Sequence, residues 1–419
     1  MKRVLILGCN EITKRVLVEL CKDPKHVSDI SLASRRKEDC DELKNLAARH
    51  GVRVTTSGID LGNVEGAMMM INILAPDLII NLLPPELALD AMNLAVKAKA
   101  DYIDAALFGV PDIPSPTSLL SKQFEKYGDF QNICKTAVCG VGFVPGAVNS
   151  IIRHAKMTSF NKIESIDIVS VEGESSSQRV RNSNIDYTLY SEDVKVPDEP
   201  GKGSGKDVFY IEKGKVVEAE SSSIEGISAS GSAVYLATSP ILTDLIKEYP
   251  EAVDVRYFKH GRKTSKLHVA PKDKIDILEE LGLLSDKPVK VGNVEVAPLD
   301  LVAEILPKMS EKKEEKEPEE RVTGISTYEI YITGLDKNDK EITKSYIIEG
   351  DNDKSYEKYN SDAFEVMKGS ALIAGVKLMC SDKWRKPGVF TPAAFECDPY
   401  YTALTKEGII VTEGDGKPF

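Results

Sequence analysis

The sequence predicts an α/β protein in which a doubly wound parallel sheet is followed by an inserted α+β domain. Over the first ~140 residues, short apolar runs alternate with helical segments, the pattern of strand–helix–strand units. Between about residues 163 and 267, alternating strand patterns separated by Gly and Ser replace that order and favour an antiparallel sheet. A chain of 419 residues also exceeds one ordinary core, so we expect two domains.

The predicted strands of the first domain are short apolar runs. They lie at residues 4–7, 30–33, 52–54, 77–83, 102–104 and 136–140. The run at 77–83 is continuously apolar, which is typical of a strand buried on both faces. The helices predicted between the strands lie at residues 12–21, 39–50, 64–74 and 88–98.

The rest of the chain is predicted to complete a second domain and then return to the first. Strands are expected at 166–169, 208–211, 233–236, 327–333 and 344–349, and helices at 272–284, 298–306 and 361–379. The last 50 or so residues have an apolar helical stripe and the only tryptophan, but too few residues for an independent core. We therefore expect domains at 1–145 and 146–366, and a C-terminal segment at 367–419 that docks on the first domain.

The second predicted strand ends in Ser34, Arg35 and Arg36. At this place a dinucleotide-binding fold meets the adenosine ribose: an acid there binds the 2′-hydroxyl of NAD, whereas arginine accommodates the 2′-phosphate of NADP. A hydroxyl followed by two guanidinium groups therefore predicts NADP(H) as cofactor.

The turn after the first strand departs from the glycine fingerprint of such folds, because its three positions are Gly8, Asn10 and Thr13. Asn tolerates a left-handed backbone better than other non-glycine residues, so the turn can survive, while Thr13 would hold the helix slightly further from the strand. The alternative is an ordinary strand–turn–helix that binds no cofactor.

The composition indicates which binding partners and which cellular compartment to expect. A net charge of −12 argues against nucleic acid, and no apolar run reaches the length of a membrane span. The 7 cysteines are scattered and the 5 histidines dispersed, so we expect reduced thiols in a cytoplasmic protein and no metal site.

Several segments together match a known family in its order along the chain. They are residues 29–35, 76–81, 100–106, 142–149 and 383–390. With them the chain resembles the saccharopine dehydrogenase-like reductases, and within these most closely the carboxynorspermidine (carboxyspermidine) dehydrogenases. The resemblance implies a Rossmann-type NADP-binding domain, a substrate and dimerisation domain that makes the protein a homodimer, and NADPH-dependent reduction of an imine in polyamine or lysine-type amino acid metabolism.

The same resemblance assigns residues to the cofactor and to a small-molecule substrate. The residues assigned to the cofactor are Gly8, Asn10, Glu11 and Ile12 for the pyrophosphate, Ser34, Arg35 and Arg36 for the 2′-phosphate, Asp60 and Leu61 beside the adenine, and Asn81, Leu82, Leu83 and Pro84 under the nicotinamide ribose. Asp104, Gly142 and Phe143 would line the place where nicotinamide meets substrate. The family commonly has a carboxylate where this chain has Val144.

Two further predictions come from the residues themselves. Asp104 ends a predicted strand, where open α/β sheets place their ligands, so it is the candidate catalytic acid; a helix cap or a loop turn would equally favour Asp there. Arg179 and Arg181, on a Ser-rich loop, are candidates for binding a substrate carboxylate, with ordinary surface arginines as the alternative. For the whole protein, the alternative to a reductase is a catalytically inactive family member that senses nucleotide or acts as a scaffold.

Overall fold

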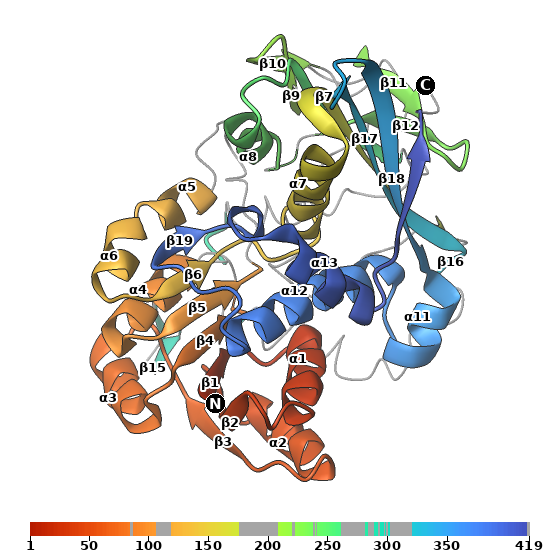
Figure 1. Ribbon diagram of the computed structural model, residues 1–419. Coiled ribbons are helices and arrows are strands. Elements are labelled where there is room, and N and C mark those ends of the chain that lie inside the picture. The colour runs from red at the N-terminus through yellow and green to blue at the C-terminus, as the bar shows by residue number, and fades with distance from the viewer. Residues whose placement is uncertain are drawn as a thin grey trace.

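Figure 1 shows two sheets with helices between and around them. The computed structural model describes residues 1–83, 87–105, 119–175, 208–219, 223–237, 239, 241–260, 281–283, 289–291, 294–296, 298, 301 and 321–416. Within these ranges, one large sheet is formed mainly by the N-terminal part of the chain and the other mainly by its middle, and each includes one C-terminal strand. Helices α7, α12 and α13 lie between the two large sheets (Figure 1).

The first sheet is wholly parallel, with the strand order β19-β6-β5-β4-β1-β2-β3. Its strands are β1 (Lys2–Leu7), β2 (Val27–Ser34), β3 (Val54–Gly58), β4 (Leu78–Asn81), β5 (Asp101–Asp104), β6 (Thr136–Val138) and β19 (Gly388–Phe390). The helices that connect and cover them are α1 (Glu11–Cys21), α2 (Asp39–Arg49), α3 (Val64–Leu74), α4 (Ala88–Ala98), α5 (Leu119–Phe124) and α6 (Tyr127–Asn132). The predicted doubly wound α/β fold is confirmed.

Apart from the edge strand β3, the strands of this sheet are largely buried on both faces. In β1, Val4 and Ile6 belong to one apolar cluster, whereas Leu5 and Leu7 belong to another on the opposite face. Successive strand residues point to opposite sides, so an unbroken apolar run is what a sheet covered on both faces requires.

The C-terminal segment lies against the first sheet. After α12 (Ala363–Cys380), β19 pairs in parallel with β6, followed by the 3₁₀ helix η6 (Pro392–Ala394) and α13 (Cys397–Lys406). Arg15 of α1 donates hydrogen bonds to the Val366 carbonyl and to Ser370 Oγ of α12, at 2.9 and 3.0 Å. These contacts join the first and last parts of the chain.

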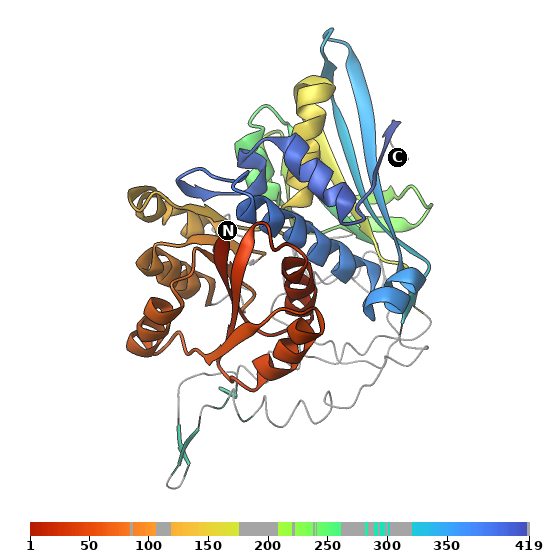
Figure 2. The same ribbon diagram turned by 60° about the horizontal axis from the view of Figure 1, so that its bottom comes forward.

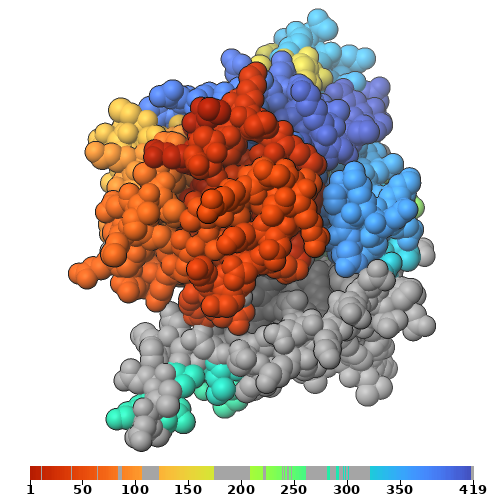
Figure 3. All heavy atoms as spheres, turned by 90° about the horizontal axis from the view of Figure 1, so that it is seen from below, coloured from red at the N-terminus to blue at the C-terminus, as the bar shows by residue number. Residues whose placement is uncertain are grey.

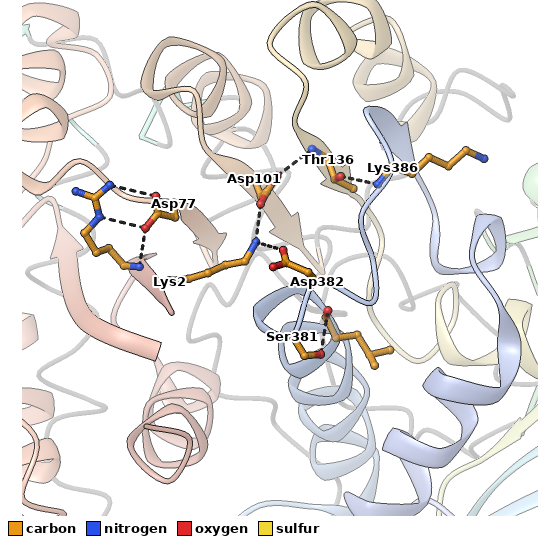
Figure 4. A network of polar contacts seen from close by, with 9 residues as sticks. Lys2, Asp77, Asp101, Thr136, Ser381, Asp382 and Lys386 are labelled. Atoms are coloured by element: carbon orange, nitrogen blue, oxygen red, sulfur yellow. Dashed lines mark hydrogen bonds and ion pairs between the residues drawn. The ribbon is translucent and has the colours of Figure 1, made fainter. Parts of the chain in front are cut away.

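A polar network fastens the amino ends of the strands to the same segment (Figure 4). Lys2 Nζ lies 2.7 Å from Asp101 Oδ2 and 2.9 Å from Asp382 Oδ1. Asp101 also accepts a hydrogen bond from the Thr136 N–H, and Thr136 Oγ1 accepts one from the Lys386 N–H. Burial lowers the pKa of Lys2, but the hydrogen bonds and charges of the two aspartates outweigh it and leave the pKa raised.

The second sheet is built around the long hairpin of β17 (Ile325–Asp336) and β18 (Glu341–Asp351), which Figure 2 shows extending beyond the helices. Its other strands are β7 (Phe160–Val171), β9 (Val208–Glu212), β10 (Lys215–Ala219), β11 (Glu225–Ile227), β12 (Ala233–Leu236), β13 (Asp254–His260) and β20 (Val411–Asp415). The prediction of an antiparallel sheet is wrong at one place, because β13 and β7 pair in parallel. The two strands are separated by about 80 residues, and a local pattern does not reveal how such distant strands pair.

Helix α7 (Ala147–Thr158) lies between the two large sheets, and more than half of its residues are buried. The remaining described elements are short: α8 (Ile241–Glu248), α11 (Asn352–Tyr359), and the strands β8 (Glu174–Ser175), β14 (Val289–Val291), β15 (Val294–Val296) and β16 (Val322–Thr323). Seen from below, residues of the first domain form most of one face, with α11 and its neighbours beside them (Figure 3). The last strand, β20, pairs with β18 of the second sheet, so the C-terminal segment contributes to both sheets. No helix among the described residues is long and apolar enough to cross a membrane.

Candidate cofactor and active site

The predicted cofactor residues come together at the carboxyl edge of the first sheet. Because β1 to β5 run parallel, the turns that follow them all lie at this edge. The segments beginning at Gly8, Ser34, Asp60 and Asn81 are those turns or strand ends. The strand order β4-β1-β2-β3 sets them side by side along the edge.

Gly8 is required by the close approach of two chain segments. Its φ is +99°, and a Cβ atom there would lie 2.7 Å from the carbonyl oxygen of Leu82, just past β4. Real Cβ atoms do not come that near to backbone, so a side chain would push the turn away from β4. The turn after β1 therefore leaves backbone, rather than side chain, facing this part of the edge.

Asn10 does not adopt the left-handed backbone conformation that its residue type tolerates. Its φ and ψ are −129° and −176°, an extended conformation, and it is the N-cap of α1. Asn10 Oδ1 accepts a hydrogen bond from the Thr13 N–H at 3.0 Å, while Asn10 Nδ2 donates to the Leu82 carbonyl at 3.1 Å. Asn is among the best N-caps, so capping explains the residue better than a left-handed turn does.

Thr13, at the third position of the glycine fingerprint, has no exposed surface. Its hydroxyl donates to the Gly8 carbonyl at 3.0 Å and accepts from the Asn10 N–H at 3.2 Å. The larger side chain thus bridges the strand end and the helix. These side-chain hydrogen bonds hold the loop after β1 in place. Glu11 and Ile12 begin helix α1, and the first backbone N–H groups of the helix point to this edge, as pyrophosphate binding requires.

The end of β2 carries a hydroxyl and two cations. Ser34 is 9% exposed and its carbonyl accepts a hydrogen bond from the Ile59 N–H at 2.8 Å, whereas Arg35 and Arg36 are exposed. The strand end is thus fixed by its neighbour β3 while both guanidinium groups reach solvent. This donor set fits the doubly charged 2′-phosphate of NADP(H).

Asp60 and Leu61 follow β3 on the same edge. Asp60 is exposed, and its Oδ1 accepts a hydrogen bond from the Gly62 N–H at 2.9 Å, while Leu61 is half-buried. The hydrogen bond fixes the carboxylate in a tight turn one strand away from Arg35. The assignment of these residues to the adenine stays a prediction.

Asn81, at the end of β4, is almost fully buried and held on both sides. Its Nδ2 donates to Tyr102 Oη at 2.9 Å, and its Oδ1 accepts from the Leu83 N–H at 3.2 Å. The amide thereby shapes the backbone at Leu82 and Leu83 where β4 leaves the sheet. Pro84, the last residue predicted for this group, lies outside the described residues.

Asp104 lies inside the protein at the end of β5. It has no exposed surface, and its carboxylate accepts hydrogen bonds from Tyr102 Oη, Gln123 Nε2 and the Gly140 N–H at 2.7, 2.6 and 3.0 Å. Three donors around one buried carboxylate are typical of a residue that fixes its neighbours. Its catalytic role stays a prediction.

Tyr102 connects this carboxylate to the strand end of β4. It accepts from Asn81 and donates to Asp104, so Asn81, Tyr102 and Asp104 form a continuous chain of hydrogen bonds across two strands. Burial, and then the nearby charge of Asp104, raises the pKa of Tyr102 well above its usual value, which keeps the phenol protonated as a donor. Sequence reasoning missed Tyr102, although its spacing of two from Asp104 within a strand places both on one face.

Gly142 and Phe143 lie in the segment between β6 and α7, which is buried. Phe143 has no exposed surface and stacks on Tyr328 of β17, with 4.5 Å between ring centroids. Val144 is 3% exposed and belongs to the main apolar cluster. These side chains join the two sheets, and their predicted contact with substrate stays a prediction.

Two other features complete the description of the site. Arg179 and Arg181, predicted for a substrate carboxylate, lie outside the described residues. Among the residues that are described, no group of three or more His, Cys, Asp or Glu side chains could hold a metal ion.

Comparison with known proteins agrees with this arrangement. The family model described as Saccharopine dehydrogenase NADP binding domain matches residues 4–138, and that described as Saccharopine dehydrogenase C-terminal domain matches residues 203–409. The chain belongs to the saccharopine dehydrogenase family. The predictions of this family and of NADP(H) as its cofactor are confirmed.

Relatives of known name match the chain over its full length. A carboxyaminopropylagmatine dehydrogenase of Synechocystis is 24% identical over 100% of this chain and 99% of its own length. A carboxynorspermidine synthase of Vibrio alginolyticus is 21% identical over 97% of this chain and 95% of its own. The apo structure of saccharopine dehydrogenase (L-Glu forming) from Saccharomyces cerevisiae superposes with a TM-score of 0.63 at 13% identity, covering 99% of this chain and 100% of that one. That likeness shows a shared fold through both sheets.

Proposed function

We propose that this protein is an NADP(H)-dependent oxidoreductase acting on CH–NH bonds, which reduces an imine formed from an amine and an aldehyde to a secondary amine with a carboxylated arm. The observation that carries the proposal is the Ser34-Arg35-Arg36 sequence at the end of β2, in a chain whose full-length relatives are named for such amines. Polyamine metabolism is the expected setting, with lysine-type amino acid metabolism as the second.

The residues of the carboxyl edge would share the work of binding the cofactor. Gly8 and the start of α1 would receive the pyrophosphate, and Arg35 and Arg36 the 2′-phosphate. When bound, NADPH supplies the hydride that reduces the imine carbon. The protein would then hold the nicotinamide and the imine carbon in the geometry for hydride transfer and would exclude water.

The buried hydrogen bonds behind this edge give Asn81 and Asp104 a positioning role. Asn81 is fixed by Tyr102, which is fixed by Asp104, so the backbone at Leu82 and Leu83 keeps one arrangement. A rigid strand end is what a nicotinamide ribose needs beneath it, because misplacement of reacting atoms by about 1 Å can cost roughly 100-fold in rate.

A catalytically inactive sensor or scaffold is the weaker alternative. Its support was the degraded glycine fingerprint together with Val144 in place of a carboxylate. Asn10 and Thr13, however, form a well-bonded turn in place of the missing glycines. The dehydrogenase and synthase names of the relatives also favour a working enzyme.

We further propose a cytoplasmic homodimer. The cysteines support the compartment, because all seven carry thiols and none is in a disulfide. The dimer rests on the family resemblance of the middle of the chain.

The test is NADPH oxidation by the purified protein with aldehyde–amine pairs, and NADP⁺ reduction with carboxynorspermidine or carboxyspermidine. We expect a kcat/KM of about 10⁴ M⁻¹s⁻¹ or more with one of these partners. Fluorescence titration with NADPH is run alongside, and a micromolar Kd is expected. No binding of NADPH up to millimolar concentration would refute the cofactor assignment, and binding without turnover of any pair would favour the sensor.

A further inference from the structure

Two cysteines meet in the cofactor-binding edge. Cys9 lies in the turn after β1, directly between Gly8 and Asn10, and Cys40 lies in the first turn of α2. Their Sγ atoms are 2.8 Å apart, compared with about 2.05 Å in a disulfide bond. A movement of under about 1 Å would therefore bring the two sulfurs to bonding distance.

The fold itself brings these residues together. Strands β1 and β2 pair in parallel with Leu7 opposite Ala33, and the Gly8 N–H donates to the Ala33 carbonyl at 2.8 Å. The turn that leaves β1 and the segment that leaves β2 therefore start from the same level of the sheet. Cys40 packs in the apolar cluster beneath, and Cys9 packs against the same cluster from the turn.

The two thiols differ in access. Cys40 has no exposed surface, whereas Cys9 is partly exposed at the edge of the sheet. Three cations, Arg35, Arg36 and Lys37, precede Cys40, but the acidic residues 38, 39, 41 and 42 adjoin it, so the charges around the pair are mixed. Oxidants act first on an accessible thiol, and of these two thiols only Cys9 is partly exposed.

We propose that Cys9 and Cys40 are a redox-active dithiol that a peroxide oxidises to an intramolecular disulfide across the cofactor-binding turn. Cys9 reacts first: its sulfur attacks hydrogen peroxide, an S–O bond forms, the O–O bond breaks, and Cys9 sulfenic acid and water result. Cys40 sulfur then attacks Cys9 sulfur, the S–O bond breaks, and the leaving hydroxide takes the Cys40 proton to give a second water. Two electrons pass from the thiols to one peroxide, and an external dithiol returns them.

The disulfide would control cofactor binding, an effect that rests on the proposed function. Cys9 lies within the turn assigned to the pyrophosphate, so a bond to α2 fixes that turn and holds it toward the 2′-phosphate site. NADPH bound over Gly8 to Asn10 would cover Cys9. We expect NADPH to slow the oxidation and the disulfide to weaken NADPH binding about tenfold or more.

Peptide mapping of the full-length protein tests the bond directly. After treatment with hydrogen peroxide and alkylation of remaining thiols, trypsin should release residues 4–14 linked to residues 38–44, and dithiothreitol should separate them. Cys9→Ser and Cys40→Ala should abolish the linked peptide. Cys134→Ser, which removes an exposed cysteine elsewhere, should leave it intact.

Formation of the disulfide and its effect on NADPH binding are tested independently. Absence of the linked peptide in the peroxide-treated wild type, or linkage of Cys9 to another cysteine, overturns the dithiol assignment whether or not NADPH binds. If the peptide forms but NADPH affinity is the same before and after oxidation, the control of cofactor binding is overturned. A reduced protein that never binds NADPH counts against the proposed function and leaves the disulfide result standing.

Discussion

The charged residues at the two ends of the first sheet have different roles. At the amino end, Lys2, Asp101 and Asp382 pair with one another and tie the strands to the C-terminal segment. At the carboxyl end, Arg35 and Arg36 are exposed and the turn at Gly8 presents backbone. The charged side chains at the amino end join the strands to the C-terminal segment, whereas Arg35 and Arg36 at the carboxyl end lie at the surface, where a ligand can reach them. Substitutions at the two ends should therefore separate stability from cofactor binding.

The largest effect should come from Gly8→Ala. The new Cβ would lie 2.7 Å from the Leu82 carbonyl oxygen at a φ of +99°, so the turn must move away from β4. We expect NADPH affinity to fall at least ~100-fold and the free energy of unfolding to fall by about 2–3 kcal/mol. Titration with NADPH and urea denaturation measure the two.

Gly51→Ala is the matched control. Gly51 also has a positive φ, +74°, but a Cβ there meets nothing within 4 Å. It should lose only about 1 kcal/mol of stability and keep its NADPH affinity. Equal effects of the two substitutions would mean that the contact with Leu82 is unimportant.

The next effect should come from Arg35→Ala and Arg36→Ala. Each removes a charge-assisted contact to the 2′-phosphate, which contributes about 1.5–3 kcal/mol, so NADPH should bind at least ~10-fold more weakly while NADH affinity is unchanged. Arg49→Ala, an exposed arginine at the end of α2, is the control and should change neither. Wild-type protein that binds NADH as tightly as NADPH would contradict the assignment.

At the other end of the sheet, Lys2→Met should affect stability alone. Lys2 bonds two aspartates and is only 12% exposed, so its loss should lower the free energy of unfolding by about 1–2 kcal/mol and leave NADPH affinity unchanged. Arg3→Met is the control: its partner is Asp77, its side chain is 46% exposed, and about 0–1 kcal/mol is expected. A loss of NADPH affinity in Lys2→Met would show that the two ends are coupled.

The smallest effect should be the pH dependence of the contribution of Lys2 to the free energy of unfolding. The pKa of Lys2 is raised above its ordinary 10.5 in the folded protein, so the folded state holds the proton more tightly than the unfolded chain. The stabilisation is complete below pH 10.5 and is lost as pH rises through the folded pKa. The difference in unfolding free energy between wild type and Lys2→Met should be constant below that pH and shrink above it; a difference that grows above it would contradict the sign.

Local patterns predicted the local structure of the first domain well. The expected helices at 64–74 and 88–98 match α3 (Val64–Leu74) and α4 (Ala88–Ala98), because apolar periodicity and flanking residues mark their ends. The cofactor followed from Ser34, Arg35 and Arg36 at a strand end, and the family followed from the resemblance of five segments along the chain. The division of the chain at 145 and 366 stays a prediction.

What the sequence did not reveal depends on contacts between distant segments. The parallel pairing of β13 with β7, the contact of Gln123 with Asp104, and the meeting of Cys9 with Cys40 all join residues in different elements of the chain. Asn10 shows a different kind of miss: its residue type fits both a left-handed turn and an N-cap, and only the backbone angles decide between them.

The tight seating of α12 has a consequence for how the protein is made. A Cβ on Gly375 would lie 2.9 Å from the Trp384 ring and 3.2 Å from Ile103, so the last part of the chain closes directly over the middle of the first sheet. Strands β4 and β5, which α12 covers, leave the ribosome more than two hundred residues before α12 does. During synthesis the N-terminal third of the chain therefore exposes an apolar face until α12 has been made. Chaperones that bind nascent apolar surface should retain this chain until its final helices emerge.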